Sequence, residues 1–334
     1  MSALTRRAFT ASALWALAAP ASAEQLDKVS FGTNWVAEAE HGGFYQAVAD
    51  GTYKKYDLDV TIVPGGPQVN NRMLLLAGKL DFFMSANCLQ SFDAVAQNIP
   101  VIAVSAIFQK DPQVLLAHPG AAEKFEDLRK LTILVSSEGL QTYYKWMEAE
   151  FGFKENQTKP YTFNPQPFLV DKNSAMQGYV TSEPFAVEKA GVKPKIFLLA
   201  DRGFNTYSTL IEARRETVEK RPDLVQRFVD ASAIGWYNYL YGNNKAANEL
   251  IRKHNADMPQ ELLDYSIAKM KEYGIVDSGD TLKNGIGAMT DAHMASFFDK
   301  MVKAGVVKPT VDFRRSYTLQ FVNKGVGLEL RPKP

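Results

Sequence analysis

The chain has 334 residues, with Lys+Arg 38 against Asp+Glu 37 and a formal net charge of +1. This balance argues against the basic stripe of a nucleic-acid-binding surface, so no nucleic-acid partner is expected. Cys88 is the single cysteine, which excludes an internal disulfide and any multi-cysteine metal site.

The N-terminal residues have the pattern of a cleaved export signal. Arg6 and Arg7 precede an apolar stretch over residues 11–19, and small residues at 21–23 form an A-x-A-type cleavage site. We therefore expect residues 1–23 to be a signal peptide cleaved after Ala23, and the mature chain to be periplasmic. The apolar stretch is shorter than the roughly 20 residues that span a bilayer, so no membrane insertion of the mature chain is expected. The paired arginines fit a twin-arginine signal, and an ordinary secretory signal is the alternative.

The mature chain begins with strands that alternate with helices. The expected strands cover residues 28–31, 58–63, 80–84 and 101–107. The expected helices cover residues 43–50, 69–77 and 89–96. This alternation predicts βαβ units and a mostly parallel sheet.

The pattern then restarts as a second, smaller α/β unit. Its expected strands cover residues 131–135, 161–163, 176–180 and 195–199, with a polar turn at 136–139 that leads into a helix over 140–151. Beyond residue 214 the composition becomes helical, and the expected helices cover residues 215–240, 245–253, 260–272 and 291–304.

We therefore predict an α/β protein of two lobes, with chain crossings near residues 112–119 and 205–211. Lobe one would comprise residues 24–115 and 208–334, with the helical C-terminal segment packed on it, and lobe two residues 116–207. Two crossings form a hinge, and ligands of α/β sheets bind at the carboxyl ends of the strands. A single large α/β enzyme is the alternative.

The run after the first strand is the strongest candidate for a ligand site. It offers an indole face, polar side chains and glycines that allow close backbone approach. Its candidate residues are Asn34, Trp35, Glu38, His41, Gly43 and Tyr45. Glu38 and Glu40 compete with Glu183 for the acidic contact to the ligand, and solvation at a helix start is their alternative role. A core tryptophan and a helix-capping histidine are the alternative interpretations.

Further loops follow the other strands and reach the same sheet edge. In lobe one they supply Gly66, Ser85, Asn87 and Phe108; in lobe two they supply Ser137, Tyr179, Thr181 and Glu183. The glycines at 65–66 either present N–H groups to an anion or form a tight turn. Glu183 either caps a helix or accepts two hydrogen bonds from an amino-substituted heterocycle.

These residues resemble solute-binding proteins of the nitrate/sulfonate/taurine class of ABC importers, and more narrowly the branch related to thiamine-pyrimidine synthases. The motifs that carry the resemblance are Asn34-Trp35, the run 41–45, Leu58-Asp59-Val60, Leu76-Ala77-Gly78 with Asp81-Phe82, and the run 179–184. The resemblance implies a periplasmic-binding-protein fold of type II. It also implies delivery of a small-molecule ligand to an ABC permease with a cytoplasmic ATPase.

Relatives of this branch hold a pyrimidine precursor of thiamine between aromatic and acidic side chains. Carried over, that role falls on Trp35, Tyr45 and Glu183, with Asn34 and His41 as polar contacts. No cofactor, metal or catalytic residue is expected, because the synthases' cysteine-rich segment has no match here. A sulfonate, nitrate or aromatic carboxylate ligand is the first alternative, and a synthase-type enzyme is the second.

Overall fold

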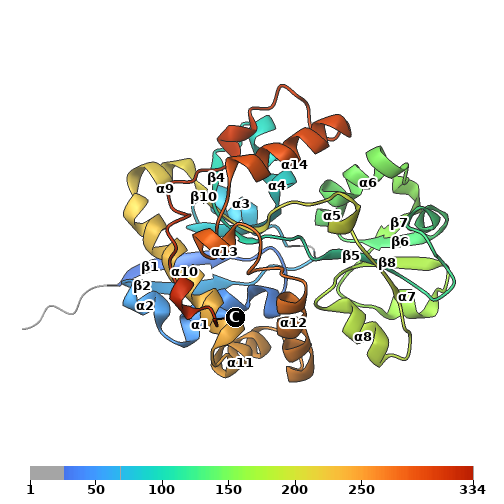
Figure 1. The fold of residues 1–334 in the computed structure, drawn as a ribbon, viewed down its shortest axis with the longest axis horizontal. Helices are drawn as coiled ribbons and strands as arrows, with labels where there is room; N and C mark the ends of the chain where they lie inside the picture. Colours follow the sequence, from blue (N-terminus) through green and yellow to red (C-terminus); the bar gives the residue numbers. More distant parts are fainter. Residues whose placement is uncertain (1–25, 68, 334) are drawn as a thin grey trace, which may run out of the picture.

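The computed structural model describes residues 26–67 and 69–333 and shows two α/β lobes joined side by side (Figure 1). The expected export signal lies outside the described residues. The predicted two-lobed α/β class is confirmed, and each lobe is built on a five-stranded sheet.

The sheet of lobe one has the strand order β2-β1-β3-β10-β4. The strands are β1 (Asp27–Gly32), β2 (Leu58–Val63), β3 (Phe82–Asn87), β4 (Val101–Phe108) and β10 (Ser208–Arg214). Strand β1 pairs in parallel with β2 and β3, whereas β10 lies antiparallel between β3 and β4. The segment that we expected to be a returning crossing is therefore the start of a central strand.

Lobe two has the strand order β7-β6-β8-β5-β9. The strands are β5 (Gln113–Ala117), β6 (Thr132–Val135), β7 (Thr158–Pro160), β8 (Ser174–Tyr179) and β9 (Lys195–Leu198). Strand β5 occupies the segment that we expected to be the outgoing crossing, and the expected lobe boundary at 115/116 falls inside it. The chain passes between the two sheets over residues 109–112 and 199–207.

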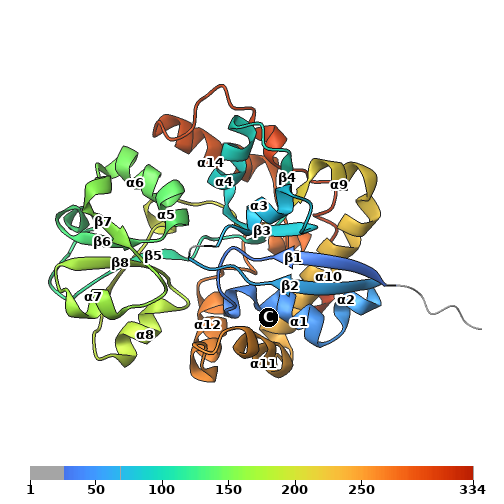
Figure 2. The ribbon, with the colours of Figure 1, turned by 180° about the vertical axis from the view of Figure 1, so that it is seen from behind.

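Helices cover both sheets, as Figures 1 and 2 show from opposite sides. In lobe one they are α1 (Gly42–Ala49), α2 (Thr52–Lys55), α3 (Asn71–Leu76), α4 (Cys88–Ala96), α9 (Arg215–Lys220), α10 (Pro222–Tyr241), α11 (Lys245–His254), α12 (Gln260–Glu272), α13 (Thr281–Asn284) and α14 (Asp291–Lys303). In lobe two they are α5 (Ser137–Gln141), α6 (Tyr143–Phe151), α7 (Gln166–Val170) and α8 (Glu183–Lys189). None of the helices within residues 26–67 and 69–333 is long and apolar enough to cross a membrane.

Two expected helices are each divided into two. The span predicted as 215–240 breaks at Arg221, because Pro222 has no N–H to continue a helix and instead begins α10. The polar turn at 136–139 and the helix after it form α5 and α6, which are separated by the irregular backbone of Thr142. Helix α10 anchors lobe one, since its Phe228 ring stacks 4.2 Å from Phe82 of β3.

Candidate functional site

A cavity lies between the two lobes, at the edge where β1, β3, β6 and β8 end. The space between its walls is about 660 Å³ when the open mouth is included. Seven of the predicted ligand-binding residues line it: Asn34, Trp35, Glu38, His41, Asn87, Tyr179 and Glu183.

The loop after β1 holds Asn34 and Trp35 in place. Thr33 Oγ1 donates to the carbonyl of Trp35 at 2.8 Å, and the N–H of Gly65 donates to that carbonyl at 3.0 Å. A Cβ on Gly65 would lie 2.4 Å from the carbonyl oxygen of Thr33, so only glycine fits under this loop. The N–H of Gly65 is therefore already engaged, which favours the turn interpretation of the glycine pair over an anion site.

The indole of Trp35 lies where the lobes meet. The ring of Phe163 in lobe two contacts it edge-on, with centroids 6.3 Å apart and an interplanar angle of 84°. The indole is only partly buried and lines the cavity. It therefore offers an aromatic surface to a flat ligand.

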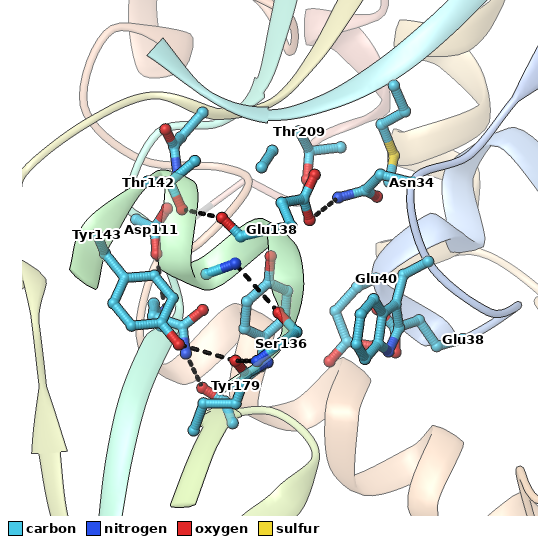
Figure 3. A pocket seen from close by; sticks show the side chains of 18 of the residues that line it. Asn34, Glu38, Glu40, Asp111, Ser136, Glu138, Thr142, Tyr143, Tyr179 and Thr209 are labelled. Carbon is cyan, nitrogen blue, oxygen red and sulfur yellow. Dashed lines mark hydrogen bonds between the residues drawn. The ribbon is translucent and has the colours of Figure 1, made fainter. Parts of the chain in front are cut away.

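Asn34 bridges the two lobes. Its Nδ2 donates to Oε2 of Glu138 at 2.9 Å, as the dashed line in Figure 3 shows. Glu138 lies in the first turn of α5, which begins there because the Ser136 side chain accepts from the N–H of Gly139. The cap at Ser136 thus places a carboxylate from lobe two opposite an amide from lobe one.

Five carboxyl groups line this one cavity. They are Glu38, Glu40, Asp111, Glu138 and Glu183. In Figure 3, Glu38 and Glu40 lie on one side of the pocket, opposite Asp111 and Tyr143. Burial raises the pKa of Glu40, Asp111 and Glu138 to about 7, and burial also raises the pKa of Glu38 and of Glu183.

The described residues that line the cavity include no lysine and no arginine. The histidine there is neutral, because burial lowers the pKa of His41 to about 3. Carboxylates accept hydrogen bonds when ionised, and a buried carboxylate without a partner is costly. The cavity is therefore suited to a cationic ligand or to one with several N–H or O–H donors.

The side chain of Glu183 is held from two directions. Its Oε2 accepts from the backbone N–H of Tyr179 at 2.7 Å, and its Oε1 accepts from the hydroxyl of Tyr161 at 2.8 Å. These bonds keep the carboxyl at the cavity wall with a fixed orientation. Glu183 is the first residue of α8, and the side chain of Ser182 forms no cap hydrogen bond.

Two polar atoms at the wall have no partner among the described residues. They are Oε2 of Glu40 and Nδ1 of His41, in side chains that are each 1% exposed. The other oxygen of Glu40 accepts from the hydroxyl of Thr181 in lobe two. Both atoms are covered by surrounding protein in this closed arrangement, so a ligand reaches them only if the wall moves.

The remaining predicted site residues do not line the cavity. Gly43 packs against Trp236, and Phe108 lies with its ring centroid 5.8 Å from the same indole. The hydroxyl of Tyr45 meets Nδ1 of His254 at 2.9 Å. These three residues belong to the core of lobe one, because α1 packs on α10 and α11 and the end of β4 packs against Trp236 of α10.

Four further predicted residues are displaced for local reasons. Ser85 is fully buried within β3, and Thr181 lies behind Glu40, to which it donates. Gly66 and Ser137 line a separate groove outside the Asn34–Glu138 bridge.

Several lining residues were not predicted from the sequence. They include Asp111, Gln113, Ser136, Glu138, Thr142, Tyr143, Gln177 and Thr209. Strand alternation gives a signal for Gln177, because it shares a face of β8 with Tyr179. Its Oε1 accepts from the N–H of Ser136 at 2.6 Å and from the hydroxyl of Tyr143 at 2.8 Å. The turn at 136–139 was expected to reach the cleft through Ser137, whereas its residues Ser136, Glu138 and Gly139 line the cavity.

Comparison with known families identifies the chain. Residues 38–247 match the family model described as NMT1/THI5 like. The chain belongs to this family. The matched range includes most of the cavity wall, from Glu38 through Glu183.

Individual relatives are more distant. The riboflavin-binding protein RibY of Chloroflexus aurantiacus is 23% identical over 330 residues, covering 94% of this chain and 92% of the relative. The periplasmic aliphatic sulphonate binding protein SsuA of Escherichia coli superposes with a TM-score of 0.62 at 14% identity, covering 87% of this chain and 91% of that chain. The desulfurization enzyme DSZB superposes with a TM-score of 0.58 at 12% identity, covering 91% and 99%. The predicted periplasmic-binding-protein fold of type II is confirmed.

Proposed function

We propose that the protein is the solute-binding component of an ABC importer and captures a small nitrogen heterocycle between its lobes. A pyrimidine precursor of thiamine is the first candidate ligand, as the resemblance of the sequence implied. The permease and its ATPase would be the partners that receive the ligand.

The observation that carries this proposal is the charge of the cleft. Five carboxyl groups from both lobes face it, with no lysine or arginine among its described lining residues. An amino-substituted heterocycle carries N–H donors on its edge and becomes cationic when its ring is protonated. Such a ligand donates to the carboxyl groups of the cleft while its face lies against Trp35.

Closure of the lobes is the mechanism of capture. Contacts from lobe one to lobe two already join Asn34 to Glu138 and Glu40 to Thr181. Outside the cavity, Ser266 of α12 donates to the carbonyl of Thr181 at 2.7 Å. A ligand that contacts both walls adds to these contacts, so it favours the closed form that a permease recognises.

Titration calorimetry of the mature protein with amino-hydroxymethyl-methylpyrimidine tests the proposal. We expect saturable binding, and we expect it to weaken about tenfold, or ~1.4 kcal/mol, in Glu183→Gln, which removes the charge but keeps the shape. The exposed Glu150→Gln is the matched control. Absence of saturable binding by this pyrimidine, its formylamino relative and riboflavin would contradict the proposed ligand class.

A flavin is the second candidate, because the riboflavin-binding relative matches over nearly the whole of both chains. An anionic ligand such as a sulfonate is disfavoured by the carboxyl groups, and the likeness to SsuA extends to the fold alone. For an anion, Glu183→Gln would strengthen binding, so the same titration separates the two classes.

The role we propose is binding rather than catalysis. DSZB has the same fold, so the fold does not decide this point. Cys88, however, is not available as a nucleophile in the cleft, because it is buried beside Tyr207 and Met294 and burial raises the pKa of its thiol to about 12. Incubation with a candidate heterocycle should return it unchanged, as measured by mass spectrometry.

A further inference from the structure

A groove continues from the cavity beyond the Asn34–Glu138 bridge. We call it the outer groove, and its walls are helix α3 with the loop before it, helix α4 and helix α5. The groove and the cavity share Asn34, Trp35, Glu138 and Thr142. The Asn34–Glu138 hydrogen bond closes the partition between the two spaces, so a ligand extends from one into the other only where it displaces this bond.

From this shared wall we infer that the outer groove is a second subsite, which holds a neutral, hydroxylated chain attached to the heterocycle. The inference rests on the proposed function and favours its second candidate, with riboflavin as the accessible example of a ring compound that carries a polyol chain.

The walls of the groove carry both apolar and amide side chains, which match the C–H groups and the hydroxyl groups of a polyol chain. On one wall, Val69 and Met73 are 52% and 59% exposed and present apolar surface to the C–H groups. On the other walls, Gln90 of α4, Gln97 directly after α4 and Gln141 of α5 carry amide groups, which can donate to and accept from hydroxyls. A chain with C–H and O–H groups in alternation contacts both kinds of wall.

The charges in the groove select a neutral chain over a phosphorylated one. Arg72 is the one cation among the described lining residues, and its Nη2 already pairs with Oε1 of Glu212 at 3.0 Å. A phosphate would instead approach the carboxylates of Asp93 and Glu138, which line the same groove.

The bridge itself can exchange for a hydroxyl group. Asn34 Nδ2 donates and Glu138 Oε2 accepts in the 2.9 Å hydrogen bond that separates the two spaces. A hydroxyl placed between them accepts from Asn34 and donates to Glu138, so neither group loses its partner. The first hydroxyl of the chain would occupy this position.

Four probes test the inference by fluorescence titration of the mature protein: riboflavin, lumichrome (the ring without the chain), riboflavin 5′-phosphate and amino-hydroxymethyl-methylpyrimidine. We expect riboflavin to bind at least about tenfold more tightly than lumichrome or the phosphate ester. Equal binding of lumichrome, tighter binding of the phosphate ester, or binding of the pyrimidine alone overturns the inference and leaves the proposed function intact. Binding of none of the four overturns both.

A variant in the groove tests where the polyol chain of the ligand lies. Gln141→Trp narrows the outer groove from an exposed position outside the cavity. We expect it to weaken riboflavin about tenfold and to leave lumichrome unchanged. The control is Val170→Trp, at a position that is 80% exposed on α7. If Gln141→Trp leaves riboflavin binding unchanged, or weakens the binding of riboflavin and lumichrome equally, the polyol chain does not lie in this groove.

Discussion

The side chains of Asn34 and Glu138 meet at 2.9 Å and join the two lobes directly across the cleft. The two residues come from different sheets and are 104 positions apart in the chain. Their hydrogen bond therefore exists only when the lobes are close together.

Asn34→Asp should open the cleft. The change replaces a donor with a second carboxyl group beside Glu138, and like charges at this distance repel. We expect a larger radius of gyration of the ligand-free protein in small-angle X-ray scattering, and ligand affinity reduced about tenfold. Asn156→Asp, at an exposed position in lobe two, is the control. An unchanged radius and affinity would show that this bridge does not contribute to closure.

Glu183→Ala should destabilise the protein even without ligand, whereas Glu183→Gln should not. Alanine leaves the N–H of Tyr179 and the hydroxyl of Tyr161 buried without a partner, at a cost of ~1–3 kcal/mol each. Glutamine accepts from the N–H and donates to the hydroxyl oxygen. Urea denaturation measures both changes in the free energy of unfolding. Equal stability of the two variants would indicate that these bonds contribute little.

The ligand-free protein should be less stable at about pH 8 than at about pH 5. Burial raises the pKa of Glu40 from 4.5 to about 7 and gives Asp111 and Glu138 similar values. Between pH 4.5, the ordinary pKa of Glu40, and about pH 7, its pKa in the folded protein, the folded state therefore binds more protons than the unfolded state. Stability is fully present below that window and is lost as the pH rises through it. The lowered pKa of His41 has the opposite effect, because it makes stability rise with pH, but only below pH 6.5.

Thermal unfolding at the two pH values measures this dependence. Glu40→Gln should raise the Tm at about pH 8 by several degrees and leave it nearly unchanged at about pH 5, whereas the exposed Glu150→Gln should change neither. A Tm that rises from pH 5 to pH 8 in the unmodified protein would refute the assignment.

Gly65→Ala should impair ligand binding more than Gly66→Ala. A Cβ on Gly65 would lie 2.4 Å from the Thr33 carbonyl oxygen and would displace the loop that carries Asn34 and Trp35. A Cβ on Gly66 would have its nearest neighbour at 3.5 Å. We expect Gly65→Ala to lower affinity at least about tenfold, measured by calorimetry, and Gly66→Ala to have little effect. Similar affinities for the two variants would count against a role for this loop.

The sequence was most informative where structure is local. Strand β2 and helix α12 have the predicted bounds, because alternation and helical periodicity decide such elements within a short window. Strands β5 and β10 were missed. Both are antiparallel to their neighbours, so an alternating βαβ pattern provides no place for them, and their partners lie far away in the sequence.

For the site, too, the sequence was informative where position follows from local structure and not where it depends on distant contacts. Residues that follow a strand directly, such as Asn34, Trp35 and Glu183, were identified because strand ends converge at one sheet edge. Within the turn at 136–139 the predicted residue was Ser137, whereas Glu138 lines the cavity, because this segment forms a short helix whose start depends on the cap at Ser136. Tyr45 and Phe108 were assigned to the cleft although their rings pack inside lobe one, since an aromatic side chain has the same signature in a core and in a pocket.

The position of β10 has a consequence for biosynthesis. Its residues 208–214 fill the gap between β3 and β4, so a nascent chain that ends before them has two strand edges without partners. The strands of lobe two, by contrast, all lie within residues 113–198. During synthesis, lobe two can therefore complete its sheet before the central strand of lobe one has been made. We expect lobe two to fold first, although lobe one begins earlier in the chain.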